Sequence, residues 1–141
     1  MSLLIQTVGA FFAVLALSVT IGVPRKYLLY SGITGGAGWF LYLAMMEAGV
    51  KEFMSMFIAT VVVALASNLF ARILKAPVSI YLIPGILPLV PGLGMYRTVY
   101  YIINQDNGMA GYYFSNTMQI AGMIALAIFF IDTFFRMVKK K

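Results

Sequence analysis

Five stretches of the chain are each apolar and long enough to cross a lipid bilayer. About 20 apolar residues in a helix span a hydrocarbon layer about 30 Å thick. The first stretch has no basic residues before it and no cleavage site of small residues, so we interpret it as a retained span rather than a signal peptide. The sequence therefore predicts an all-α, polytopic membrane protein whose residues 1–141 form a single transmembrane domain of about five helices. These run from about Leu3 to Gly22, Tyr27 to Gly49, Phe53 to Leu74, Pro77 onward, and Phe114 to Val138.

The composition agrees with a bilayer as the solvent. Hydrophobic residues make up 62% of the chain and charged residues 10%, whereas about 25% of the residues of a soluble domain are charged. The chain has no Cys and no His, which excludes thiolate and imidazole metal sites and the usual nucleophile pairs of hydrolases. We therefore expect no metal, no cofactor and no catalytic residues. A membrane enzyme is the weaker alternative, because no predicted span holds a pair of acids.

Basic residues fall on one side of the predicted membrane. Eight of the ten Lys and Arg residues lie at or after the ends of the first, third and fifth spans: Arg25, Lys26, Arg72, Lys75, Arg136 and Lys139 to Lys141. The positive-inside rule places this side in the cytoplasm, so we expect a cell-membrane protein with its N-terminus outside and its C-terminus inside. Because these charges are divided among short loops, we expect no nucleic acid partner. The outer side carries an aromatic belt of Tyr96, Tyr100, Tyr101, Tyr112 and Tyr113.

An odd number of spans has a structural consequence. Five helices that start outside, joined to five that start inside, make two halves of opposite orientation, which is the inverted-repeat plan of many secondary transporters. We expect this chain to be one such half.

The segment "SGITGGAG" gives the second span a surface of small residues. Gly32 and Gly36 stand four residues apart, with Gly35 beside them. Small residues at such spacing let helix backbones approach closely in membranes. We interpret Gly32, Gly35 and Gly36 as a helix contact rather than a ligand site.

The segment "IPGILPLVPGLGMYR", residues 83 to 97, concentrates helix breakers inside the fourth span. Pro84, Pro88 and Pro91 fall within about 60° of one another on a helix face. Each lacks the N–H that would bond the carbonyl four residues earlier, which frees the carbonyls of Ile80, Pro84 and Leu87. Lipid cannot satisfy these carbonyls, so the segment predicts a broken helix beside a polar cavity or a close helix contact.

Glycines after the prolines permit a new helix to start near Leu93 to Met95. The free N–H groups and positive dipole end of such a start favour an anion, and Arg97 follows one turn later. We predict a site for a carboxylate, or for an amine and a carboxylate together. A merely kinked helix is the alternative, and Arg97 would then lie harmlessly near the outer headgroups. The predicted substrate-binding residues are Pro84, Pro88, Pro91, Gly92, Gly94, Tyr96 and Arg97.

The run "ARILKAPVSIYLIPGILPLVPGLGMYR", with "VPRKYL" and "SGITGG" upstream, resembles the threonine/serine exporter family. The resemblance is to its small-subunit type, which corresponds to the C-terminal membrane half of the fused exporters, and it covers about residues 3 to 137. It implies proton-driven export of small amino acids or, in some split pairs, of a dicarboxylate. It also implies a larger partner subunit that carries a cytoplasmic domain. Where the family pattern often has a basic residue after the glycines, this chain has Trp39.

Acidic residues are scarce for a proton-coupled transporter, which normally needs a carboxylate within the membrane. Glu47 and Glu52 flank an outer loop, Asp106 lies in an outer turn, and Asp132 stands four residues before Arg136, as in a surface ion pair. We therefore expect the coupling acid in the partner. The predicted function is that of a transporter membrane subunit, and the alternative is a scaffold subunit that transports nothing.

Overall fold

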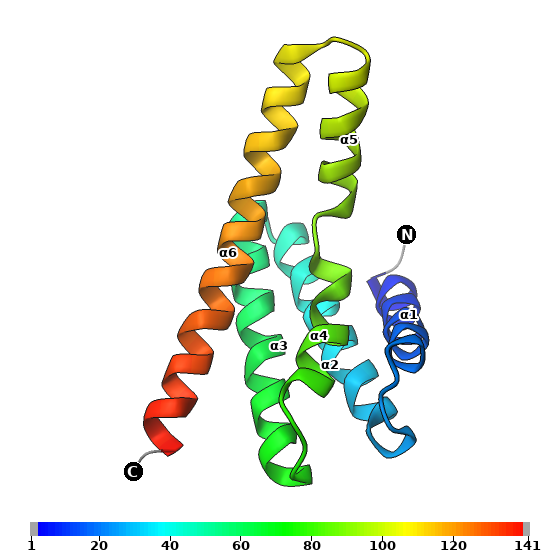
Figure 1. Ribbon diagram of the computed structural model, residues 1–141, viewed down its shortest axis with the longest axis vertical. Coiled ribbons are helices and arrows are strands. Elements are labelled where there is room, and N and C mark those ends of the chain that lie inside the picture. Colours follow the sequence, from blue (N-terminus) through cyan, green and yellow to red (C-terminus); the bar gives the residue numbers. More distant parts are fainter. Residues whose placement is uncertain (1–2, 140–141) are drawn as a thin grey trace.

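The computed structural model describes residues 3–139, and within them the chain folds as a bundle of α-helices without strands. Three helices follow one another as antiparallel neighbours: α1 (Leu3–Ile21), α2 (Arg25–Glu47) and α3 (Glu52–Leu74). The chain then passes through α4 (Ser79–Ile86), one turn of 3₁₀-helix, η1 (Leu87–Leu89), and α5 (Gly92–Ile103). It ends in α6 (Asn107–Lys139), which packs along both α3 and α5 (Figure 1).

The number of membrane spans is confirmed only in part. By length and composition, α1, α3 and α6 can each cross a membrane, and the α4–α5 pair makes a fourth span if the two bent pieces are counted together. The helix α2 has 23 residues but is not among these candidates, because its glycines and hydroxyl residues replace the apolar side chains of a typical span. Those small residues are buried inside the bundle: Ser31, Gly32, Thr34, Gly35, Gly36 and Gly38.

The last helix begins earlier than the apolar pattern predicts. It starts at Asn107 rather than near Phe114, because a carboxylate oxygen of Asp106 accepts a hydrogen bond from the N–H of Met109 at 3.1 Å. Such a cap satisfies an N–H that the helix start leaves unpaired. The 33 residues of α6 extend over about 50 Å at 1.5 Å per residue. As a result, the α5–α6 hairpin reaches past the ends of α1, α2 and α3 (Figure 1).

The glycines of α2 lie against both neighbouring helices. A Cβ atom on Gly35 would overlap the side chain of Val14 in α1, and one on Gly38 would overlap Val63 in α3. A Cβ on Gly32 would lie 2.9 Å from the Phe11 ring. At Gly36 the nearest atom, also in α1, would be at an ordinary 3.5 Å. The helix α2 is thus packed between α1 and α3 at distances that larger side chains would prevent.

The apolar core lies where α3, η1 and α6 meet. Its buried residues are Met56, Ala59, Val63, Leu89, Ile120 and Ile124, with Trp39 and Tyr42 of α2 packed against them. The 3₁₀ turn therefore lies inside the bundle, so the interruption of the fourth span is a central feature of the fold.

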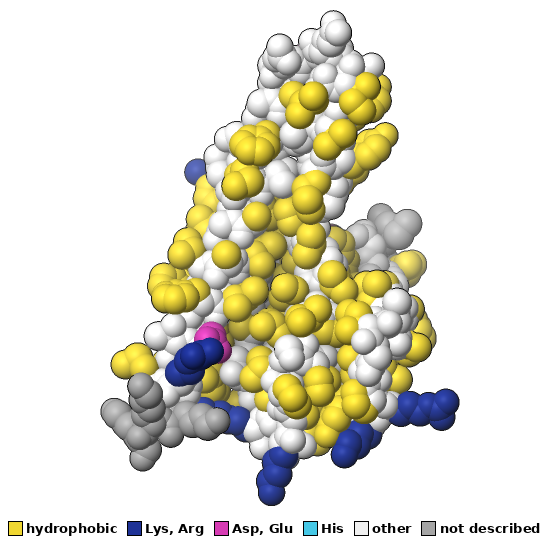
Figure 2. Space-filling model, in the orientation of Figure 1, with side chains coloured by type: hydrophobic (Ala, Val, Ile, Leu, Met, Phe, Trp, Pro, Cys, Tyr) yellow, Lys and Arg dark blue, Asp and Glu magenta, His cyan; other side chains and the backbone are white. Residues whose placement is uncertain are grey.

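Basic side chains gather at one end of the bundle, as Figure 2 shows. This is the end at which α2 begins and α3 and α6 finish, and the α5–α6 turn lies at the other end (Figure 1). The alternation of helix directions thus places Arg25, Lys26, Arg72, Lys75 and Arg136 at the same end of the bundle.

Candidate functional site

The fourth span is broken between Leu89 and Gly92. Its two parts meet at a bend of 50°, and between them Val90 adopts an extended conformation. Each proline has a distinct place: Pro84 lies inside α4, Pro88 in η1, and Pro91 caps the start of α5. The break predicted from the Pro/Gly pattern is therefore present.

The carbonyl groups that the prolines free all find donors within the protein. The Ile80 carbonyl accepts a hydrogen bond from the Ser31 hydroxyl of α2 at 3.0 Å. The Pro84 carbonyl accepts from the N–H of Leu87, and the Leu87 carbonyl from the N–H of Val90 at 3.3 Å. The freed groups thus stabilise the 3₁₀ turn and attach α4 to α2.

A cavity of about 450 Å³ opens beside the break, between α2, α3, α5 and α6. Of the predicted substrate-binding residues, Pro88, Pro91, Gly92, Gly94 and Arg97 line this cavity. Pro84 is instead fully buried in the bundle, and Tyr96 stacks on Tyr100 with 64% of its surface exposed. The rest of the lining comes from the neighbouring helices and the break itself: Trp39, Tyr42, Glu52, Met56, Val90, Leu93, Tyr112, Tyr113, Asn116, Thr117 and Ile120.

Two opposite charges face this cavity without pairing. Glu52, half-buried in the first turn of α3, and the exposed Arg97 of α5 both line it. The ion pair found among the described residues is that of Arg136 with Asp132, at 2.9 Å, so neither Glu52 nor Arg97 has an ionic partner. The Arg97 guanidinium lies 5.3 Å from the centre of the Tyr113 ring. The cavity therefore offers one cation and one anion to a ligand.

The start of α5 adds backbone donors. The N–H of Gly92 bonds the Val90 carbonyl at 2.8 Å and that of Met95 bonds the Pro91 carbonyl at 3.1 Å. Within the described chain, the N–H groups of Leu93 and Gly94 make no backbone hydrogen bond. Helix starts leave such donors free, and they carry a partial positive charge. They lie on the same helix as Arg97, one turn before it.

The α5 start also passes very close to α6. A Cβ atom on Gly94 would overlap the hydroxyl oxygen of Thr117, whereas one on Gly92 would meet nothing within 4 Å. That hydroxyl is buried and has no hydrogen-bond partner among the described residues. A side chain at position 94 would therefore force either the Thr117 hydroxyl or the start of α5 to shift.

Glu52 is the charged residue of the site that sequence reasoning missed, among several uncharged lining residues that it also missed. The sequence pattern predicts Glu52 at the edge of an outer loop. In the structure, α3 begins at Glu52 itself. A carboxylate is favourable in the first turn of a helix because of the helix dipole. That signal, an acid directly before a long apolar run, could have placed Glu52 on the helix and toward the bundle.

The model of the family described as "Threonine/Serine exporter, ThrE" matches residues 6–134. The chain belongs to the threonine/serine exporter family. Members of this exporter family are transporters, and the apolar helices agree with a multi-pass membrane protein. No curated protein and no solved structure matches the chain significantly. For this exporter, the break and the cavity beside it are the strongest candidate for a functional site.

Proposed function

We propose that the chain is the membrane subunit of a secondary transporter that exports small amino acids, and that the cavity at the helix break holds the substrate. The observation that carries this proposal is the pair of unpaired charges, Glu52 and Arg97, which line one cavity. A zwitterion has one group for each of them. The volume of about 450 Å³ lies in the range of about 300–1,000 Å³ that is usual for small-molecule sites.

The substrate carboxylate binds at the start of α5 in this proposal. The Arg97 guanidinium can form two parallel hydrogen bonds with a carboxylate. The free N–H groups of Leu93 and Gly94, which carry a partial positive charge, can donate to the same carboxylate. Both features come from the break, because a continuous helix would use these donors internally.

The substrate ammonium binds at Glu52. We place it there rather than at the carbonyls of Ile80, Pro84 and Leu87, because each of these carbonyls already accepts a hydrogen bond. Aromatic faces of Tyr42 and Trp39 on the same cavity can add cation–π attraction. Since Glu52 is engaged by the substrate, we still assign the proton-coupling acid to the partner.

Trp39 bears on the range of substrates. It lines the cavity at the position after the α2 glycines where the exporter pattern often has a basic residue. Without that second cation the cavity holds one guanidinium, Arg97, which suits a single carboxylate. A dicarboxylate would leave one of its charges unpaired, at a substantial desolvation cost. We therefore propose amino acids as preferred substrates and dicarboxylates as poorer ones.

We place the proposed larger partner subunit on the α5–α6 hairpin. A groove of about 720 Å³ between these helices is lined almost entirely by apolar side chains, among them Met95, Val99, Ile102 and Met118. The hairpin extends past the rest of the bundle (Figure 1) and its apolar residues are largely exposed, as at Ile103 with 73%. We propose that the partner's membrane half packs there, with the N-terminus of this chain outside and its C-terminus in the cytoplasm.

Efflux from proteoliposomes tests the proposed function. Vesicles are loaded with labelled threonine or serine, and a proton gradient is applied to drive efflux. The efflux rate is compared among vesicles that contain this chain alone, the larger subunit alone, both subunits, or neither. The proposal expects export only when both subunits are present. A scaffold role is the alternative, and it would be supported if the larger subunit alone exported at the full rate.

A further inference from the structure

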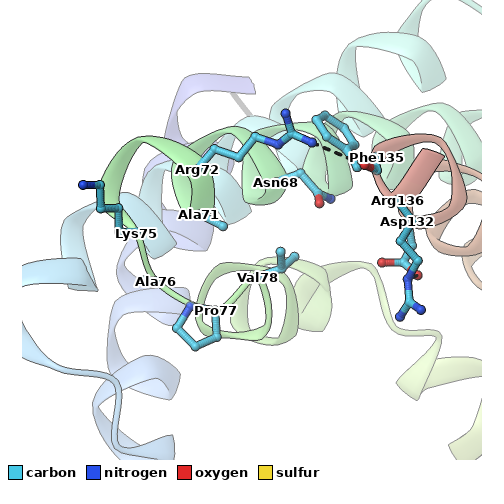
Figure 3. Close-up of a pocket in the computed structure, with 10 residues that line it drawn as sticks. All are labelled: Asn68, Ala71, Arg72, Lys75, Ala76, Pro77, Val78, Asp132, Phe135 and Arg136. Atoms are coloured by element: carbon cyan, nitrogen blue, oxygen red, sulfur yellow. Dashed lines mark hydrogen bonds and ion pairs between the residues drawn. The ribbon is translucent and has the colours of Figure 1, made fainter. Parts of the chain in front are cut away.

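A second cavity, of about 650 Å³, lies at the basic end of the bundle (Figure 3). It is formed by the last turns of α3, the connection to α4 and the last turns of α6. No residue of the cavity at the helix break takes part in it. Its lining residues are Asn68, Ala71, Arg72, Lys75, Ala76, Pro77, Val78, Asp132, Phe135 and Arg136.

The cavity carries an excess of positive charge. Its cations are Arg72, Lys75 and Arg136, and its one carboxylate, Asp132, is paired with Arg136 at 2.9 Å. Arg72 and Lys75 therefore have no acidic partner among the described residues. An anion that entered the cavity would neutralise charges that the protein itself leaves uncompensated.

Arg72 is held in place for such an anion. One guanidinium nitrogen donates a hydrogen bond to the Phe135 carbonyl of α6 at 3.3 Å (Figure 3). The guanidinium also lies 4.8 Å from the centre of the Phe135 ring. An arginine has five N–H donors in a rigid fork, so most of them remain available. Because the side chain is already ordered, an anion would lose less affinity to ordering it.

The other side of the cavity is apolar. Ala71, Pro77, Val78 and Phe135 line it beside the charged groups. The cavity lies at the end of the bundle where basic side chains gather (Figure 2). Basic side chains at the end of membrane helices can reach anionic lipid headgroups. Basic cavities between membrane helices on the cytoplasmic side are suited to anionic headgroups. A soluble anion would use the charges but not the apolar wall.

We propose that this cavity binds an anionic phospholipid, with the headgroup phosphate on Arg72 and the glycerol region against Val78 and Phe135. Lys75, whose side chain points away from Arg72 at the rim (Figure 3), adds positive charge beside the headgroup. The site does not depend on what the transporter carries. Occupied by a lipid, it links the end of α3 to the end of α6 through one ligand.

Native mass spectrometry of the full chain in detergent can test this site. The protein is titrated with phosphatidylglycerol, with phosphatidylcholine, and with phosphatidylglycerol in the presence of inorganic phosphate. We expect one phosphatidylglycerol to remain bound, phosphatidylcholine to be retained at least tenfold more weakly, and millimolar phosphate to compete poorly. Equal retention of both lipids, or full competition by phosphate, would overturn the proposal.

Two variants separate the cavity from general surface charge. Arg72→Gln with Lys75→Gln should lower the affinity for phosphatidylglycerol about tenfold or more, because charge-assisted hydrogen bonds are lost. Arg25→Gln with Lys26→Gln removes the same charge at the same end but outside the cavity, and should change little. An equal loss in both pairs would mean that only surface charge attracts the lipid. Should the first pair fold poorly, Lys75→Gln alone, on an exposed side chain, should still lower retention relative to Lys26→Gln.

Discussion

The Ser31 hydroxyl of α2 donates a hydrogen bond at 3.0 Å to the Ile80 carbonyl of α4, the carbonyl that Pro84 deprives of its helical partner. Two sequence features that are 49 residues apart thus complete each other. The small residues of α2 let α4 approach closely. Ser31, in the same segment, then donates to the carbonyl that Pro84 leaves without its helical donor. Ser31 is fully buried and the bond is partly buried, and lipid could not replace a lost donor.

Ser31→Ala should destabilise the protein by about 1–3 kcal/mol, because it leaves the partly buried Ile80 carbonyl without a donor. Ser67→Ala is the matched control. Ser67 is equally buried, but it donates to the Val63 carbonyl one turn earlier in its own helix, and that carbonyl keeps its backbone partner. Unfolding in detergent with increasing denaturant measures both variants. Equal losses of stability would show that the interhelical bond contributes no more to stability than a hydroxyl bond within one helix.

Gly35→Ala should weaken the α1–α2 contact, because the new Cβ overlaps Val14. Overpacking of this kind costs about 1–3 kcal/mol. Gly36→Ala places its Cβ 3.5 Å from Phe11 and should be neutral or slightly stabilising, since alanine favours helix over glycine. Adding Val14→Ala to Gly35→Ala should restore part of the lost stability. Thermal unfolding of the four proteins checks this, and a Gly36→Ala variant weaker than Gly35→Ala would contradict it.

Gly94→Ala should reduce transport, while Gly92→Ala should not. A methyl group at position 94 collides with the Thr117 hydroxyl, whereas position 92 has free space. The start of α5 would then move away from α6 and take the free N–H groups and Arg97 with it. Efflux rates of the two variants, at matched expression, give the comparison. Loss of transport in Gly92→Ala alone would show that backbone freedom, not the close approach to α6, matters at this turn.

The orientation of the chain can be read from thiol labelling, because the sequence has no native cysteine. Gln105→Cys lies in the α5–α6 turn and Lys75→Cys in the α3–α4 connection, at opposite ends of the bundle. An impermeant maleimide on intact cells should label Gln105→Cys at once and Lys75→Cys only after permeabilisation. The reverse pattern would refute the outside N-terminus and the inverted-half arrangement.

Sequence alone predicted the helical class and the broken fourth span well, because these depend on local rules. Long apolar runs must form helices in lipid, and prolines must interrupt them. The bounds of the first three helices followed from the same runs, to within a few residues. The start of α6 did not, because the Asp106 cap outweighs the polar character of the residues that follow it.

The candidate site was harder to predict because it depends on distances between helices. Nothing local to Ser31 indicated that it would bond the Ile80 carbonyl, so the sequence left open whether that carbonyl faces a polar cavity or a helix contact; the structure shows a helix contact. Glu52 is 45 residues from Arg97 in the chain, and only the packing of α3 against the broken span brings them to one cavity. Tyr96 was grouped with Arg97 by proximity in sequence, but adjacent helix positions point to different sides.

Efflux measured for an amino acid and a dicarboxylate in parallel tests the central claim, that Glu52 and Arg97 bind the two ends of a zwitterion. Glu47→Gln and Arg25→Gln, exposed charges outside the cavity, serve as controls. Arg97→Gln should slow export of both substrates, by a factor that corresponds to about 1–3 kcal/mol for a lost charge-assisted bond. Glu52→Gln should slow only the amino acid, since a dicarboxylate has no ammonium group. Wild-type export of the amino acid by both cavity variants, with each protein folded and paired with its partner, would contradict the account.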